Sequence, residues 1–172
     1  MLDFMSTVLT EPLYHSELID GHEVQKPLPK KLHFLIEAFI IVTLARLLPK
    51  RFRVGPELNV LCGADRLVPD VSVVDRDARY INGDLADPAI LCVEIVSPGQ
   101  TIANLFDKAD RLLRAGTPLC WIIWPERRKA WMYTADDLVE AADTLQALLP
   151  DGNTIQVSTA EMWAELDEPA PA

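Results

Sequence analysis

Two short apolar runs in this chain each contain one acidic residue, and this pattern limits the possible fold more than any other feature. Asp70 lies in residues 68–74, and Glu94 lies in residues 89–96. Short apolar runs bounded by Pro and Gly are typical of buried β-strands. A carboxylate in such a strand loses its hydration, which is costly unless something pairs with it. A divalent cation shared by carboxylates is a common solution, so the pair indicates a hard-metal site and hence phosphate chemistry.

Side-chain alternation decides which residues of the two predicted strands share a face. Asp70 and Ser72 point to the same side of their strand, and Cys92 and Glu94 share a side of theirs. If the two strands are neighbours, Asp70 and Glu94 converge on one ion.

The rest of the pattern predicts one domain of mixed helices and strands, because 172 residues suit a single domain. We expect a loose arm at residues 1–12, a single domain at 13–167 and a frayed tail at 168–172. The order of the elements predicts an α/β or α+β fold with a mixed sheet. The expected elements are a hairpin at 17–24, helices at 32–47, 101–115 and 159–166, strands at 51–62, 68–74, 89–96, 119–124, 129–134 and 155–157, a loop at 75–88, and a segment at 137–149 that is open between helix and strand.

Charge and hydropathy limit the partners and the compartment. The net charge is −10, which counts against broad electrostatic attraction to nucleic acid, although a local basic rim, a metal ion or a partner subunit would supply positive charge. No apolar stretch reaches membrane-spanning length, and the N-terminus does not have the pattern of a signal peptide. We therefore expect a cytoplasmic protein with no membrane partner. Three cysteines, an odd number, are expected to be buried thiols rather than disulfides.

Several segments together resemble the Uma-type restriction endonucleases of the PD-(D/E)XK nuclease superfamily. The resemblance runs from about residue 14 to residue 133, and the combination is more specific than any of its parts. The segments that carry it are Val-Pro-Asp at 68–70, Val-Glu-Ile-Val-Ser-Pro at 93–98, Asp107-Lys108, Ala-Gly-Thr-Pro at 115–118 with Trp121-Ile122-Ile123, and Glu-Leu-Ile-Asp-Gly at 17–21 with Pro27, Pro29 and His33.

The resemblance implies a restriction-endonuclease-like fold, with a central mixed β-sheet flanked by helices and Mg²⁺ or Mn²⁺ between the acids. The superfamily pattern is an aspartate after proline, then an acid two residues before a lysine. Asp70 and Glu94 match the acids, but Val96 stands in the place of the lysine. The family places the lysine on the following helix, where Lys108 matches it. Related members often have an acid four residues before that lysine, and here the residue is Asn104.

We therefore predict a metal-dependent endonuclease that hydrolyses DNA phosphodiester bonds. Asp70, Glu94 and the Ile95 carbonyl would hold the cation. Lys108 would position the hydrolytic water and stabilise the transition state, because an ammonium group balances the charge that develops on phosphate.

Other readings stay open for several residues. Glu57 is either a third carboxylate ligand or a surface acid, and His33 is either substrate-facing or a polar residue at a helix start. Ser97 has no evident base in the sequence, so a serine nucleophile is not supported. The basic turn at 127–129 is either a solvated hairpin or a small phosphate patch.

The alternative function is a non-catalytic protein with a nuclease fold that binds nucleic acid or a protein partner. The acidic charge favours this alternative, whereas the two acids and the lysine favour the nuclease. The sequence also leaves open a homodimer.

Overall fold

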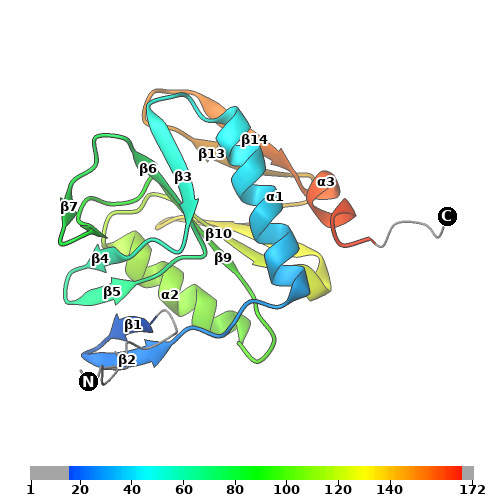
Figure 1. Cartoon of the computed structure of the whole chain (residues 1–172). Helices are drawn as coiled ribbons and strands as arrows, with labels where there is room; N and C mark the ends of the chain where they lie inside the picture. The colour runs from blue at the N-terminus through cyan, green and yellow to red at the C-terminus, as the bar shows by residue number, and fades with distance from the viewer. Residues whose placement is uncertain (1–15, 168–172) are drawn as a thin grey trace, which may run out of the picture.

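A six-stranded mixed sheet forms the centre of the computed structural model, which describes residues 16–167 (Figure 1). The arm expected at 1–12 and the tail expected at 168–172 lie outside the described residues. Strands β9 and β10 are parallel, and every other neighbouring pair in this sheet is antiparallel. The strand order is β12 (Leu138–Glu140), β11 (Lys129–Tyr133), β10 (Cys120–Trp124), β9 (Leu91–Ile95), β6 (Val71–Asp75) and β3 (Phe52–Pro56).

Two helices cover opposite faces of this sheet. Helix α1 (Lys31–Leu47) buries Ile36, Ile40 and Leu44 in one apolar core with Val71 and Val93. Because these side chains recur at helical spacing, one stripe of the helix faces the sheet. The prediction of a mixed sheet flanked by helices is confirmed.

Helix α2 (Ile102–Arg114) packs on the other face, in a second core that contains Leu105, Leu112 and Cys92. The helix begins after Thr101, whose hydroxyl accepts a hydrogen bond from the Asn104 amide. This N-cap satisfies one of the amides that the first turn leaves without a partner. Helix α2 is therefore fixed directly after β9, the strand that contains Glu94.

A second sheet and a C-terminal unit complete the described part of the chain. The second sheet has the order β2 (His22–Gln25), β1 (Ser16–Ile19), β5 (Asp65–Leu67), β4 (Val60–Cys62), β8 (Asp84–Leu85) and β7 (Tyr80–Ile81). The C-terminal unit comprises β13 (Thr144–Leu148), β14 (Thr154–Ser158) and α3 (Thr159–Ala164), and the short 3₁₀ helix η1 (Pro125–Arg127) joins β10 to β11. The hairpin of β1 and β2 lies below α2 in the view of Figure 1.

Four element predictions were wrong in detail. The strand expected at 68–74 is β6, which begins at Val71, so Asp70 directly precedes the strand instead of lying within it. The strand expected at 51–62 is two strands, β3 and β4, in different sheets, because the chain leaves β3 at Pro56 and Glu57 adopts a left-handed conformation with φ of 49°. The loop expected at 75–88 contains the short strands β7 and β8, and the last helix ends at Ala164 rather than at residue 166. The open segment at 137–149 is strand rather than helix.

Two further expectations concern the thiols and the membrane. Cys92 and Cys120 are buried free thiols as expected, whereas Cys62 is only half-buried. Among residues 16–167, no helix is long and apolar enough to cross a membrane.

Candidate active site

The register of two central strands brings the two predicted acids together. Strands β6 and β9 are antiparallel, with Val71 opposite Val93 and Ser72 opposite Cys92. Continuing this register by one residue places Asp70 beside Glu94. Asp70 itself directly precedes β6 and lies outside the hydrogen-bonded ladder, so strand alternation does not assign its face. The two side chains nevertheless line the same cavity.

Asp70 is almost fully buried, and both of its carboxylate oxygens have protein donors. Its Oδ1 accepts a hydrogen bond from Lys26 Nζ at 2.8 Å, and its Oδ2 accepts one from the Ile95 amide at 2.7 Å. Burial alone would raise the pKa of Asp70, but nearby cationic groups, with Lys26 first among them, outweigh burial and lower it. Asp70 is therefore a carboxylate at neutral pH.

Glu94 is paired with Lys108, as the proximity of β9 and α2 allows. Lys108 Nζ lies 2.8 Å and 3.0 Å from the two Glu94 oxygens, donates to the Val68 carbonyl at 2.8 Å and lies 2.7 Å from Glu17 Oε1. Glu17 Oε1 also accepts a hydrogen bond from the Val68 amide at 2.7 Å. Lys108 is thus buried and fixed from three sides, and a solvated helix lysine is excluded.

Burial and charge shift the pKa values of this pair in different ways. Burial raises the pKa of Glu94 to about 8, although the charge of Lys108 opposes this shift. Burial alone would lower the pKa of Lys108, but Glu94 and Glu17 outweigh it and raise the pKa. One ammonium group is shared between two acids, so Glu94 can hold a proton at neutral pH while Lys108 stays charged.

These side chains line one cavity of about 270 Å³. The cavity lies between the β1–β2 hairpin, the first turns of α2 and the ends of the central strands. Its charged walls include Glu17, Lys26, Asp70, Glu94 and Lys108, and its rim includes Gln100, Asn104, Asp107 and Arg111. Arg111 binds Asp20 of the hairpin turn and Asp65 of β5, so this contact joins the hairpin to α2.

A histidine and a glutamate from α1 approach Asp70 from the other side. His33 Nε2 lies 3.7 Å from both Asp70 Oδ1 and Glu37 Oε2, and His33 Nδ1 lies 2.8 Å from Ser97 Oγ. Burial lowers the pKa of His33, against the opposing charge of Asp70, so the ring is neutral at pH 7. Burial also raises the pKa of Glu37 to about 7, with Asp70 and Glu57 adding to the shift.

The contact with His33 corrects one sequence inference, because Ser97 does have a base beside it. Ser97 is only 2% exposed, however, and does not line the cavity. A nucleophile must reach its substrate, so we assign the Ser97 hydroxyl to holding the His33 ring.

The remaining predicted site residues lie at different distances from the cavity. Glu57 lies outside any strand, and its Oε1 is 3.9 Å from Lys26 Nζ, so it faces the ammonium group rather than the cavity. The Ile95 amide holds Asp70, and the role of its carbonyl as a ligand stays a prediction. His33 contacts Asp70 rather than the cavity, and its substrate-facing role also stays a prediction.

The carboxylate oxygens of this site are suitable ligands for a divalent cation, although lysines pair with them in this structure. Mg²⁺ and Mn²⁺ prefer carboxylate oxygens, and Asp70 and Glu94 present them side by side. Glu94 Oε1 is buried and has no hydrogen-bond partner with suitable geometry within the described range. Within residues 16–167, however, no three His, Cys, Asp or Glu side chains are grouped closely enough to hold a metal ion.

Sequence reasoning missed three charged residues of this site: Glu17, Lys26 and Glu37. Glu17 was placed in a hairpin and in a segment that carries the family resemblance, but it was given no role in the site. Lys26 precedes a Pro-containing segment without any motif. Glu37 had a usable signal, because it interrupts the apolar run of α1 in the way that Asp70 and Glu94 interrupt theirs.

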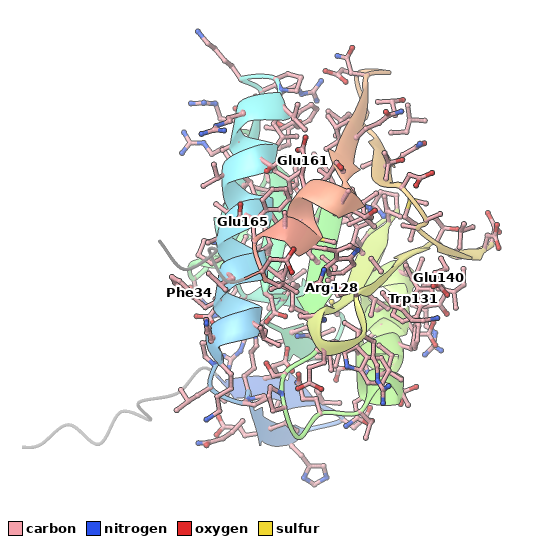
Figure 2. All side chains as sticks on the ribbon, turned by 90° about the vertical axis from the view of Figure 1, so that its right-hand side faces the viewer. Phe34, Arg128, Trp131, Glu140, Glu161 and Glu165 are labelled. Carbon is pink, nitrogen blue, oxygen red and sulfur yellow. The ribbon has the colours of Figure 1, made fainter. Side chains whose placement is uncertain are left out.

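The basic turn at 127–129 is part of a different surface. Arg128 pairs with Asp167, and Lys129 Nζ lies 3.1 Å from Glu140 Oε1, so acidic partners offset both charges. Figure 2 shows Arg128 on the face that carries α3, whereas the β1–β2 hairpin beside the cavity lies at the lower end of the molecule. The structure favours the solvated hairpin over a phosphate patch.

The fold and the site together define the class of restriction-endonuclease-like nucleases. The central mixed sheet places an aspartate directly before β6 and a glutamate in the neighbouring strand β9, and a buried lysine from the next helix contacts the glutamate. The chain belongs to the Uma2 family, described as "putative restriction endonuclease", whose family model matches residues 3–167.

A solved structure agrees with this assignment. The chain is similar to a crystal structure described as a putative nuclease belonging to DUF820 from Anabaena variabilis ATCC 29413, with a TM-score of 0.75 and 25% sequence identity. The match covers 88% of this chain and 90% of that one. No curated protein matches the sequence.

Proposed function

We propose that this chain is a metal-dependent endonuclease that hydrolyses phosphodiester bonds in DNA. The observation that carries the proposal is the convergence of Asp70, Glu94 and Lys108 in one cavity, although they come from three separate segments of the chain. Membership of a nuclease family supports the same chemistry. Burying two acids and an ammonium group together is costly, and a function that uses them explains why the fold retains them.

Each residue has a role that follows from its position. Asp70 and Glu94 would hold Mg²⁺ or Mn²⁺, together with the Ile95 carbonyl. When bound, such a cation lowers the pKa of water and offsets phosphate charge. Lys108 holds a fixed positive charge at the cavity wall, where it orients water and stabilises negative charge on the phosphate. Glu17 keeps the Lys108 side chain in this position.

The charge of the chain sets how DNA would bind. With a net charge of −10, the protein has no long-range attraction to the phosphate backbone. Cleavage would therefore depend on contacts at the cavity rim, and we expect weak binding at physiological salt.

A second candidate function is a non-catalytic nuclease-fold protein that binds nucleic acid or a protein partner. One observation favours it: lysines already pair with both acids, Lys26 with Asp70 and Lys108 with Glu94. Asn104 lines the cavity at the position where related nucleases often have an acid, and this departure points the same way.

A cleavage assay separates the two candidates. Supercoiled plasmid and a single-stranded oligonucleotide are incubated at low salt with Mg²⁺ or Mn²⁺ and with wild type, Asp70→Asn, Lys108→Met or Lys129→Gln. We expect cleavage by wild type and Lys129→Gln, and a loss of about a hundredfold or more in the other two variants, because each lacks a group that acts in the transition state. Absence of cleavage by the wild type with either metal would favour the non-catalytic protein.

A further inference from the structure

Lys26 is a buried lysine in the candidate site, and no sequence motif predicts it. Its side chain is only 9% exposed, and Nζ lies 2.8 Å from Asp70 Oδ1 and 3.9 Å from Glu57 Oε1. Its charge also acts on Glu37 and Glu94. One ammonium group therefore sits among four carboxyl groups, one of which it contacts directly.

This position is the one that a cation on Asp70 would take. Asp70 Oδ2 already accepts a hydrogen bond from the Ile95 amide, which leaves Oδ1 as the more available oxygen for a ligand. Lys26 Nζ covers Oδ1. Several carboxyl groups around a partly buried position stabilise either an ammonium group or a divalent cation. The two cations repel each other at close range. Both cannot contact Oδ1 with full strength at the same time.

Lys26 is also free to leave in a way that Lys108 is not. Lys26 lies on the chain between β2 and α1, and the neighbouring residues 20–25 and 27–31 are exposed. Its flexible side chain ends in a strongly hydrated group, so it can rotate from Asp70 into water. The Lys108 side chain is about as buried as that of Lys26, but it is held on α2 by two acids and a carbonyl oxygen.

We propose that Lys26 is an internal counter-ion that occupies the cation position on Asp70 and competes there with the divalent cation. This inference rests on the proposed function and deepens it, because it makes metal loading a competition within the site. While Lys26 binds Asp70 the site is closed to the metal. When Lys26 leaves, Asp70, Glu94 and their neighbours Glu57 and Glu37 present an excess of negative charge to a divalent ion.

Calorimetric titration with Mn²⁺ tests the proposal without any assay of activity. We compare the full-length wild type with Lys26→Gln and Lys26→Met at low salt. Gln retains a donor for Asp70 without the charge, so it keeps the protein folded if Met does not. We expect Mn²⁺ to bind both variants about tenfold or more tightly than the wild type, because a neighbouring opposite charge shifts a carboxylate's affinity for a proton by one to three orders of magnitude, and a metal competes in the same way.

Two controls make the result specific. Lys129→Gln removes one lysine charge and one ion pair on an exposed surface, and it should leave the affinity unchanged. Adding Asp70→Asn to Lys26→Gln should abolish the binding. Circular dichroism in chelator confirms that each variant is folded.

The outcomes separate this proposal from the proposed function. Tighter binding by Lys26→Gln, or binding by Lys26→Gln alone, supports the counter-ion. Equal or weaker binding by the folded variant, with clear binding by the wild type, overturns the counter-ion and leaves the metal site in place. No binding by either protein overturns both.

Discussion

The candidate site contains two carboxylate–lysine pairs that differ in how firmly their lysines are held. Lys108 comes from α2 and contacts Glu94, Glu17 and the Val68 carbonyl. Lys26 comes from the exposed connection between β2 and α1 and has one close contact, with Asp70. Both side chains are buried, but the first lysine is held by three contacts from a packed helix, whereas the second is held by one close contact from an exposed connection. The difference indicates that one cation serves the chemistry in place and the other must move.

The largest expected effects come from replacing each lysine in turn. We expect Lys108→Met to lower the free energy of unfolding by about 3–5 kcal/mol, because it leaves Glu94 and Glu17 buried without a cation. Lys26→Met should cost about 1–2 kcal/mol, because Asp70 keeps the Ile95 amide and can gain a proton from the edge of the cavity. Urea denaturation in chelator measures both values. A loss for Lys26→Met as large as that for Lys108→Met would show that both lysines are structural.

Glu37 makes the stability of the Lys26 side of the site depend on pH. Its pKa is raised to about 7 in the folded protein, so the folded state holds a proton that the unfolded state loses near pH 4.5. The stability from this proton is complete below about pH 4.5 and is lost as the pH rises through 7. Relative to Glu37→Gln, the wild type should lose about 2–3 kcal/mol over this interval.

Unfolding curves of both proteins from pH 4.5 to pH 8 in chelator check this expectation. The difference between the proteins isolates Glu37 from other titrating groups. Parallel pH profiles would mean that Glu37 titrates normally.

Glu94 gives the matching experiment on the Lys108 side. The pKa of Glu94 is raised, as that of Glu37 is, so the stability from the Glu94 proton is lost as the pH rises through about 8. In chelator, Glu94→Gln should match the wild type within about 1 kcal/mol at pH 6 and exceed it by about 1–2 kcal/mol at pH 9, because the amide carries no buried charge. Thermal unfolding at the two pH values measures the change. A variant that is much less stable at pH 6 would identify Glu94 as a structural partner of Lys108.

The contact between the hairpin and α2 should have the smallest effect. Arg111 is partly exposed and pairs with Asp20 and Asp65, so Arg111→Gln should change global stability by less than about 1 kcal/mol. Hydrogen exchange should nevertheless become faster in β1 and β2, since this contact joins the hairpin to α2. Unchanged exchange there would show that strand pairing alone holds the hairpin near Asp70.

The sequence predicted the two acids of the site. Asp70 and Glu94 stand out because an acid in an apolar run has few structural explanations. Asp70 lies just before β6 rather than within it, so alternation along a strand does not explain its position. The fold class and the two long helices followed from periodicity. The division of the predicted strand at 51–62 did not, because a turn with a positive φ at Glu57 gives no periodic signal.

The lysine pairings depended on tertiary structure. Glu17 lies in the hairpin and Lys26 directly follows it, and nothing in the sequence of these polar segments indicates burial. Both side chains line the cavity because the hairpin packs beside α2. Lys108 was assigned from the family resemblance, since a lysine on an amphipathic helix is usually solvated. The structure confirms that it meets Glu94, whereas its catalytic role stays a prediction.

Anomalous scattering from crystals grown with saturating Mn²⁺ tests the central claim most directly. The account predicts one peak in contact with the carboxylates of Asp70 and Glu94, with Lys26 Nζ moved away from Asp70 Oδ1 and Lys108 still on Glu94. Density without a peak in this cavity, or Lys26 still bound to Asp70 beside the metal, would contradict it.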